Sequence, residues 1–235
     1  MANSVLLNNL DHKDLRVITT RGVDYGDSVM FALTFPTEFR SIQAHYPIVF
    51  RKTADGQFQP IALFGFKERQ NLFLKPGGWD ATYLPLMVER QPFLIGISAQ
   101  EMMIHVDLDS PRISRTAGEA LFREHGGSTE FLERMNSVLL AIHQGLESTP
   151  PFLAALLQHD LLESFVLDIE LDDGSQNRLA GFHVIHEERL ASLGGTVLES
   201  LSKAGHLQAA YMAIASLSNF RDLIRRQNST HARDR

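Results

Sequence analysis

The chain of 235 residues contains no cysteine. This absence excludes a disulfide scaffold, a cysteine-ligated zinc site, an iron–sulfur cluster and a cysteine nucleophile. No apolar run approaches the length of about 20 residues that a membrane-spanning helix needs. The first residues lack both the basic start and the unbroken apolar segment of a secretory signal. We therefore expect a protein without a membrane span, located in the cytoplasm.

The overall amino-acid composition is close to the average of globular proteins, with 44% hydrophobic and 21% charged residues. The net charge of −6 is unevenly spread, because the last fifteen residues hold five arginines and two aspartates. Their charge of +3 leaves −9 for the rest of the chain, which would repel phosphates, so we expect no nucleic-acid partner. We expect one domain over residues 1–227 and a flexible basic tail over residues 228–235.

The first half of the chain has the pattern of β-strands. Residues 45–52 and 58–66 flank Asp55-Gly56, a turn signal that is typical of a β-hairpin. Further strands are expected at the apolar runs over residues 28–35, 91–97 and 102–108, of which the first stops at Pro36 and the last at Asp109.

The second half is mainly helical. A 3.6-residue period runs from Phe131 to Leu146 behind a cap at Ser128 or Thr129, and Pro150 is expected to start a new helix. A hairpin over residues 165–186 follows, and then helices that end in a long one over residues 207–224. This order predicts an α+β fold with one domain. A largely antiparallel sheet from the N-terminal half would include the late hairpin and be covered by the C-terminal helices, the last of which offers a homodimer face.

Five blocks of the sequence carry a resemblance to a known family. They are residues 45–50, residues 78–93 (from Gly78-Trp79 through Tyr83-Leu84-Pro85 to Arg90-Gln91-Pro92-Phe93), residues 118–122, residues 179–190, and residues 205–217. Their order and spacing resemble the SapC family over residues 10–227. The chain departs from the family pattern at Glu89-Arg90 and His186-Glu187, where two basic residues and an Asp-Glu pair are expected.

The resemblance implies a bacterial protein of a family named after a surface-array (S-layer) gene locus, unrelated to the peptide-transporter permease of the same name. It also implies neighbours that resemble flavin-dependent halogenases or cupins. It carries over no catalytic residue. The function expected from it is a binding or accessory protein for a peptide, a small molecule or a neighbouring enzyme, and no cofactor is expected.

Aromatic residues within these blocks are the candidate ligand-binding site. Tyr46, Trp79, Tyr83 and Phe93 lie beside glycine or proline, and large amphipathic rings on loops suit a ligand pocket. Core packing is the alternative explanation for such rings. Arg90 would supply a charged contact, for instance to a carboxylate.

The alternative function is a non-haem iron oxygenase. His105-Val106-Asp107 places a histidine and a carboxylate on one face of a strand, and a distal His183 would complete a two-histidine, one-carboxylate site for Fe. Arg189 could then pair with a 2-oxoglutarate carboxylate. A solvated strand end is the competing explanation, and the chain has no Gly-x-Ser-x-Gly or Walker motif. The sequence therefore leans away from an enzyme.

Overall fold

The computed structural model describes residues 3–98 and 101–231. Its central feature is a five-stranded antiparallel sheet in the order β12-β13-β4-β5-β3. The strands are β3 (Phe31–Leu33), β4 (Ile48–Lys52), β5 (Phe58–Leu63), β12 (Leu162–Glu170) and β13 (Gln176–Ile185). His183 of β13 lies opposite Phe50 of β4, so the late hairpin joins the sheet of the N-terminal half. The predicted α+β class is confirmed.

The β4–β5 hairpin forms where Asp55-Gly56 predicts it. The Thr53 amide donates to the Gln57 carbonyl at 2.8 Å, which closes the loop. Gly56 has a φ of +84°, a conformation that glycine adopts without the steric cost of a Cβ atom.

Three smaller sheets lie beside the central one. The first has the order β1-β9-β8, the second β10-β2-β11, and the third pairs β6 with β7. Their bounds are β1 (Ser4–Leu6), β2 (Arg16–Val17), β6 (Leu74–Lys75), β7 (Gly78–Trp79), β8 (Phe93–Ser98), β9 (Glu101–Asp107), β10 (Ile113–Ser114) and β11 (Glu119–Ala120). The strands expected near residues 91–97 and 102–108 therefore pair with each other as β8 and β9.

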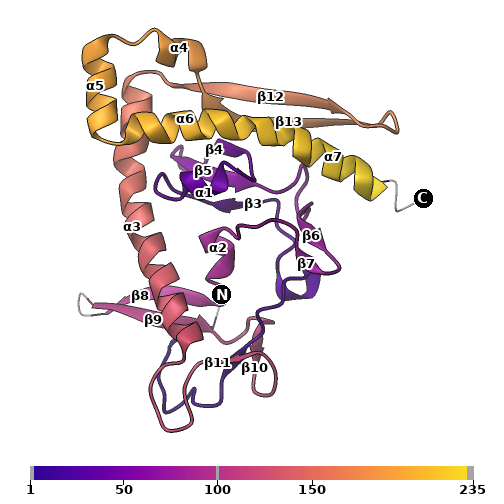
Figure 1. The fold of residues 1–235 in the computed structure, drawn as a ribbon, viewed down its shortest axis with the longest axis vertical. Coiled ribbons are helices and arrows are strands. Elements are labelled where there is room, and N and C mark those ends of the chain that lie inside the picture. The colour runs from indigo at the N-terminus through magenta and orange to yellow at the C-terminus, as the bar shows by residue number, and fades with distance from the viewer. Residues whose placement is uncertain (1–2, 99–100, 232–235) are drawn as a thin grey trace.

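Helices link the upper and lower parts of the molecule. Figure 1 shows α3 running from beside the central sheet at the top down to β8 and β9 in the lower part of the molecule. The helical elements are η1 (Val23–Tyr25), α1 (Phe39–Ile42), α2 (Leu86–Glu89), α3 (Glu130–Gln158), α4 (Glu187–Ala191), α5 (Gly195–Lys203), α6 (His206–Ser216), η2 (Leu217–Asn219) and α7 (Phe220–His231). Even the 29-residue α3, the longest described helix, is not apolar enough to cross a membrane, and neither is any other described helix.

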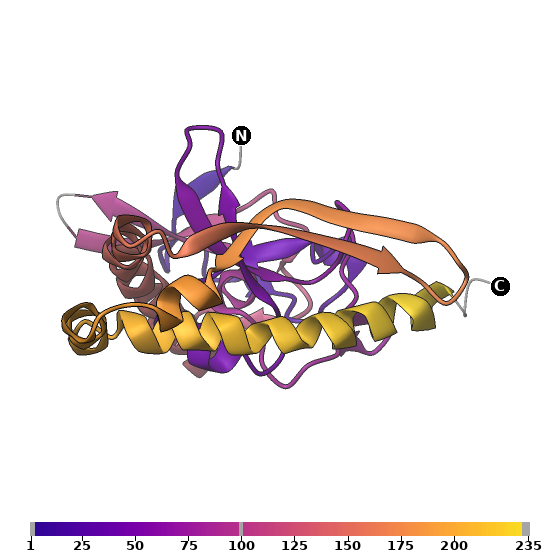
Figure 2. The same ribbon diagram turned by 90° about the horizontal axis from the view of Figure 1, so that it is seen from above.

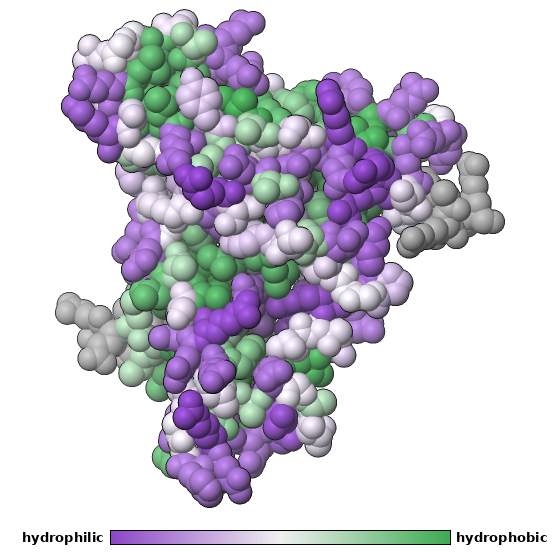
Figure 3. All heavy atoms as spheres, in the orientation of Figure 1, coloured by the Kyte–Doolittle hydropathy of each residue, from purple (hydrophilic) through white to green (hydrophobic). Residues whose placement is uncertain are grey.

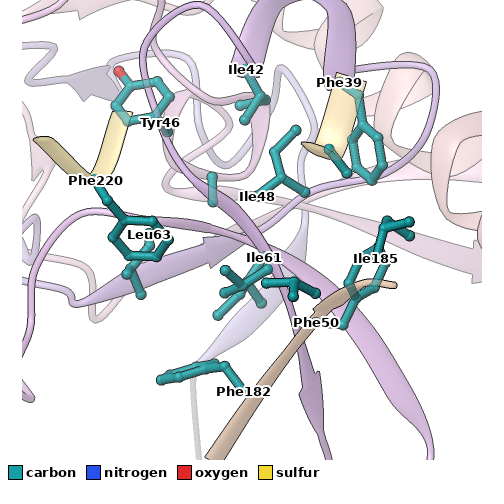
Figure 4. Packing of buried hydrophobic residues seen from close by; sticks show 14 of the residues in the cluster. Phe39, Ile42, Tyr46, Ile48, Phe50, Ile61, Leu63, Phe182, Ile185 and Phe220 are labelled. Carbon is teal, nitrogen blue, oxygen red and sulfur yellow. The ribbon is translucent and has the colours of Figure 1, made fainter. Parts of the chain in front are cut away.

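The main core lies between the central sheet and its covering helices. Figure 4 shows side chains of β4, β5 and β13 converging with Phe39 and Ile42 of α1 and Phe220 of α7. Phe152 of α3 enters the same core, where its ring meets that of Phe39 edge-on at 5.9 Å. A second cluster lies lower, between the small sheets and the N-terminal half of α3. One helix thus contributes to both clusters, which ties the two parts into a single domain.

The prediction of a new helix at Pro150 is wrong, because α3 runs unbroken from Glu130 to Gln158 with Pro150 and Pro151 inside it. A helical proline leaves the carbonyl four residues earlier without its usual donor. Those carbonyls belong to Leu146 and Glu147, which are both exposed. Water can therefore reach them, and burial of the flanking residues in the two cores holds the helix together.

The predicted long final helix is an almost continuous rod of α6, η2 and α7. Figure 2 shows the rod lying alongside the β12–β13 hairpin. The Ser216 hydroxyl accepts a hydrogen bond from the Ile48 amide at 2.8 Å, and Phe220 stacks on Phe165 at 5.3 Å. α7 continues to His231. The prediction that a flexible tail begins at residue 228 is therefore wrong for residues 228–231, which are helical. Residues 232–235 of that predicted tail lie outside the described residues.

Candidate functional site

Three of the four aromatic residues of the predicted site, Tyr46, Trp79 and Tyr83, are linked by hydrogen bonds. Trp79 Nε1 donates to the Tyr46 hydroxyl at 2.7 Å, and Tyr46 donates to the Tyr83 carbonyl at 2.5 Å. Phe73 stacks on Trp79 with ring centroids 6.3 Å apart, and the Arg226 guanidinium lies over Phe73 at 4.3 Å. Burial raises the pKa of Tyr46. This network fixes the loop around Trp79 against the central core.

Two of the candidate ligand-binding residues are not accessible to a ligand in this structure. Tyr46 and Phe93 are both completely buried. Tyr46 packs in the upper core, and Phe93 packs in the lower core against Phe131. Both rings, which lie beside Pro47 and Pro92 in the chain, belong to the core, the alternative that the sequence left open. Trp79 and Tyr83 are half-buried.

Tyr83 is held by a buried carboxylate, Glu38, which no sequence motif singles out. The Tyr83 hydroxyl donates to Glu38 Oε1 at 3.0 Å, and the Leu86 amide donates to the same oxygen at 2.8 Å. Thr34 donates to the other oxygen at 2.7 Å. Burial raises the pKa of Glu38. Glu38 thereby joins the loop after β3 to the start of α2.

Arg90 is half-buried at the end of α2. Its Nη1 donates to the Phe93 carbonyl at 2.7 Å, and within the described residues it has no carboxylate partner. Burial lowers the pKa of its guanidinium. Its other donors have no acceptor among the described residues, and a ligand contact at Arg90 stays a prediction.

The predicted metal residues are not brought together, so the oxygenase geometry is wrong. His105 and Asp107 lie on β9, whereas His183 lies on β13 in the central sheet. His183 packs edge-on against Phe58 at 4.8 Å. Across the described ranges, no three His, Asp or Glu side chains are grouped so that they could hold a metal ion. Arg189 instead lies 3.9 Å from Asp160.

A buried ion network joins the N-terminal segment to the loop before β10. Both oxygens of Asp27 accept from Arg112 Nη2, at 2.7 and 2.6 Å, and both side chains are almost fully buried. The Gly22 amide also donates to Asp27, at 2.8 Å. Arg21 Nη1 lies 3.4 Å from the same carboxylate and donates to the Val88 carbonyl at 3.1 Å. Burial first, and then Arg112, lower the pKa of Arg21.

Arg21 lines a groove between α2 and the start of α3, which we call the α2–α3 groove. Its volume is about 530 Å³. Apolar walls come from Leu84, Phe131 and Met135, and the polar walls from Thr19, Arg21, Glu89, Gln91, Glu119, Glu130 and Arg134. Arg134 and Glu89 form an ion pair at 2.5 Å within it. Figure 3 shows hydrophilic and apolar side chains intermixed on the face of the molecule that it draws.

A second groove of about 440 Å³ lies between the C-terminal half of α3 and the β4–β5 hairpin. Its lining is mainly apolar, with the half-exposed Leu146 and Leu157 on one wall and Phe58 on the other. Asp55 is the one charged residue among those that line it. It therefore offers less polar recognition than the α2–α3 groove does.

Comparison with known families settles the family resemblance. A family model described as SapC matches residues 7–223. The chain belongs to the SapC family. No curated protein and no solved structure matches it.

The SapC resemblance extends across both parts of the molecule. The block at residues 45–50 enters β4, and the block at residues 179–190 forms the end of β13 and most of α4. The block at residues 78–93 contains β7 and α2 and supplies Leu84, Glu89 and Gln91 to the α2–α3 groove. Sequence reasoning missed the groove because its other walls come from segments far away in the chain.

Proposed function

We propose that this SapC-family chain is a binding or accessory protein whose ligand lies in the α2–α3 groove. The observation that carries the proposal is the lining of this groove, in which an apolar surface lies beside arginine, glutamate and glutamine side chains. Ligand sites combine apolar walls with a few polar groups in this way, and their volumes are commonly about 300–1,000 Å³. A short peptide or a small molecule fits that description.

The lining groups favour binding over catalysis. Among the described residues that line the groove, Thr19 has the one hydroxyl and no histidine is present. The Arg134–Glu89 pair is suited to orient a ligand rather than to exchange a proton, because an arginine stays protonated. These features support a holding role for the groove.

Trp79, Tyr83 and Arg90 remain candidates for contacts at the edge of the same site. Tyr83 and Arg90 are the chain neighbours of Leu84 and Gln91, which line the groove. A halogenase-like or cupin-like partner, a homodimer and a cytoplasmic location remain predictions from the sequence.

Selection from a displayed library of random heptapeptides tests the proposal. Enriched peptides would be synthesised, and their affinity measured by calorimetry with the full chain. We expect binding that Arg134→Gln weakens, since 71% of the Arg134 side chain is exposed and its loss should leave the fold intact. Arg123→Gln is the matched control, because Arg123 is exposed and does not line the groove. Failure to enrich any peptide, or equal affinities for the two variants, would contradict the proposal.

A further inference from the structure

We propose that Arg21 is the anion-recognising residue of the α2–α3 groove and that the ligand presents a carboxylate to it. The inference rests on the proposed function, because it names the chemical class of the ligand for the same site. It starts from the observation that Arg21 and Arg112 share a single carboxylate, Asp27.

The Asp27 carboxylate binds Arg112 more closely than it binds Arg21. Arg112 Nη2 donates to both oxygens at 2.7 and 2.6 Å, whereas the Arg21 contact measures 3.4 Å. The Gly22 amide uses a further lone pair of the carboxylate. Strong charge-assisted hydrogen bonds between nitrogen and oxygen are about 2.7–2.9 Å long, so the Asp27 charge is used mainly by Arg112.

The hydrogen-bond donors of Arg21 are only partly used. Both of its bonds within the described residues come from Nη1, to Asp27 and to the Val88 carbonyl. Nε and Nη2 therefore have no protein acceptor there, and neither is among the fully buried atoms without a partner. Only 11% of the Arg21 side chain is exposed, and this residue lines the groove. A planar guanidinium edge with free Nε and Nη2 donors matches the two oxygens of a carboxylate.

The other charges of the groove favour a carboxylate over a phosphate dianion. Arg134 is paired with Glu89, and the exposed Glu119 and Glu130 also line the groove. The lining thus holds two arginines and three glutamates. The glutamates repel a ligand with two negative charges more strongly than a ligand with a single carboxylate. A single carboxylate on an apolar body would satisfy Arg21 and contact Leu84, Phe131 and Met135.

The first experiment uses the unmodified protein and four probes. N-acetyl-leucine, its uncharged amide N-acetyl-leucinamide, inorganic phosphate, and sodium chloride at matched ionic strength would be titrated while arginine Nε–Hε signals are followed by NMR. We expect the acid to shift the Arg21 signal and to bind about 10- to 100-fold more tightly than the amide, the range for a hydrogen bond to a charged group. Equal binding of acid and amide would overturn the inference. Tighter binding of phosphate than of the acid would overturn the choice of a carboxylate.

Variants provide the second experiment. Arg21→Gln removes the guanidinium and Arg21→Lys keeps its charge, and we expect both to lose most of the preference for acid over amide. Arg115→Gln is the matched control, because Arg115 is exposed and lies outside the groove. If Arg21→Gln does not fold, Arg21→Lys and the four-probe titration still decide the question. Library peptides that bind both Arg21 variants as tightly as they bind the wild type would overturn this inference alone, whereas a library without binders would overturn the proposed function.

Discussion

Asp27 and Arg112 are 85 positions apart in the chain and form a buried ion pair in which one Arg112 nitrogen reaches both carboxylate oxygens. Arg112 also donates to the carbonyls of Ile18 and Thr20, at 2.9 Å each. The pair therefore fixes the segment that carries Arg21 in position beside the groove. Its geometry is the link between the fold and the proposed site.

Removing the Asp27 charge should destabilise the protein strongly. Asp27→Asn leaves two arginines without their carboxylate, and breaking one side of a buried ion pair costs about 3–5 kcal/mol. Urea denaturation at neutral pH would measure this loss. Asp168→Asn is the control, because the Asp168–Arg178 pair is exposed and 3.6 Å long, and such pairs contribute about 0–1 kcal/mol. Equal losses in the two variants would contradict the assignment of Asp27 as a structural anchor.

The hydrogen bonds of the Tyr46 hydroxyl should be measurable through Trp79, the only tryptophan in the chain. Tyr46→Phe removes the acceptor of the Trp79 indole and leaves the Tyr83 carbonyl without its donor. We expect a loss of about 1–3 kcal/mol in the free energy of unfolding and a shifted Trp79 fluorescence maximum. Tyr211→Phe is the control, since Tyr211 is 53% exposed. An unchanged emission spectrum in Tyr46→Phe would argue against this network.

Glu38 should make the stability depend on pH. Burial raises its pKa above the ordinary value of 4.5, so the folded protein binds this proton more tightly than the unfolded chain does. The corresponding stabilisation is fully present below the unfolded pKa and is lost as pH rises through the folded pKa. Urea denaturation of the wild type and Glu38→Gln between pH 4 and 7 would measure it. We expect the stability difference, wild type minus variant, to fall as pH rises. A difference that is constant or that rises would contradict the prediction.

Close packing of α3 on Phe35 should make Gly145 irreplaceable. A Cβ atom at Gly145 would lie 2.1 Å from the Phe35 ring. Alanine gains up to about 1 kcal/mol over glycine in a helix, and overpacking a core typically costs about 1–3 kcal/mol. We expect Gly145→Ala to lower the melting temperature. Gly195→Ala is the matched control in α5, because nothing lies within 4 Å of its added Cβ, and it should leave the melting temperature equal or higher. The reverse order of the two melting temperatures would contradict the described packing.

How far the sequence predicts the fold depends on whether the deciding interaction is local. The Asp55-Gly56 turn and the Thr129 cap are local signals, and both are confirmed: Thr129 accepts from the Leu132 amide at 3.3 Å. The continuous helix through Pro150 depends on the burial of α3 in both hydrophobic cores. The sequence around Pro150 does not reveal that burial. The groove cannot be predicted for the same reason, since Arg21 and Arg134 line one groove only after α3 has packed on the N-terminal segment. Tyr46 and Phe93 were misassigned because a buried ring and a ligand-binding ring have the same local sequence.

Arg90 tests whether the ligand site extends beyond the groove. Within the part of the chain that the structure describes, Arg90 has an acceptor for Nη1 alone, the Phe93 carbonyl, and it does not line the groove. We expect Arg90→Gln to weaken the affinity for library peptides by a smaller factor than Arg21→Gln does. Calorimetry would give the affinities, and urea denaturation would separate them from any loss of stability caused by removing the Phe93 contact. If Arg90→Gln leaves every peptide affinity unchanged, Arg90 joins α2 to β8 and has no part in binding. If it weakens binding more than Arg21→Gln does, the anion lies at the end of α2 and not in the α2–α3 groove.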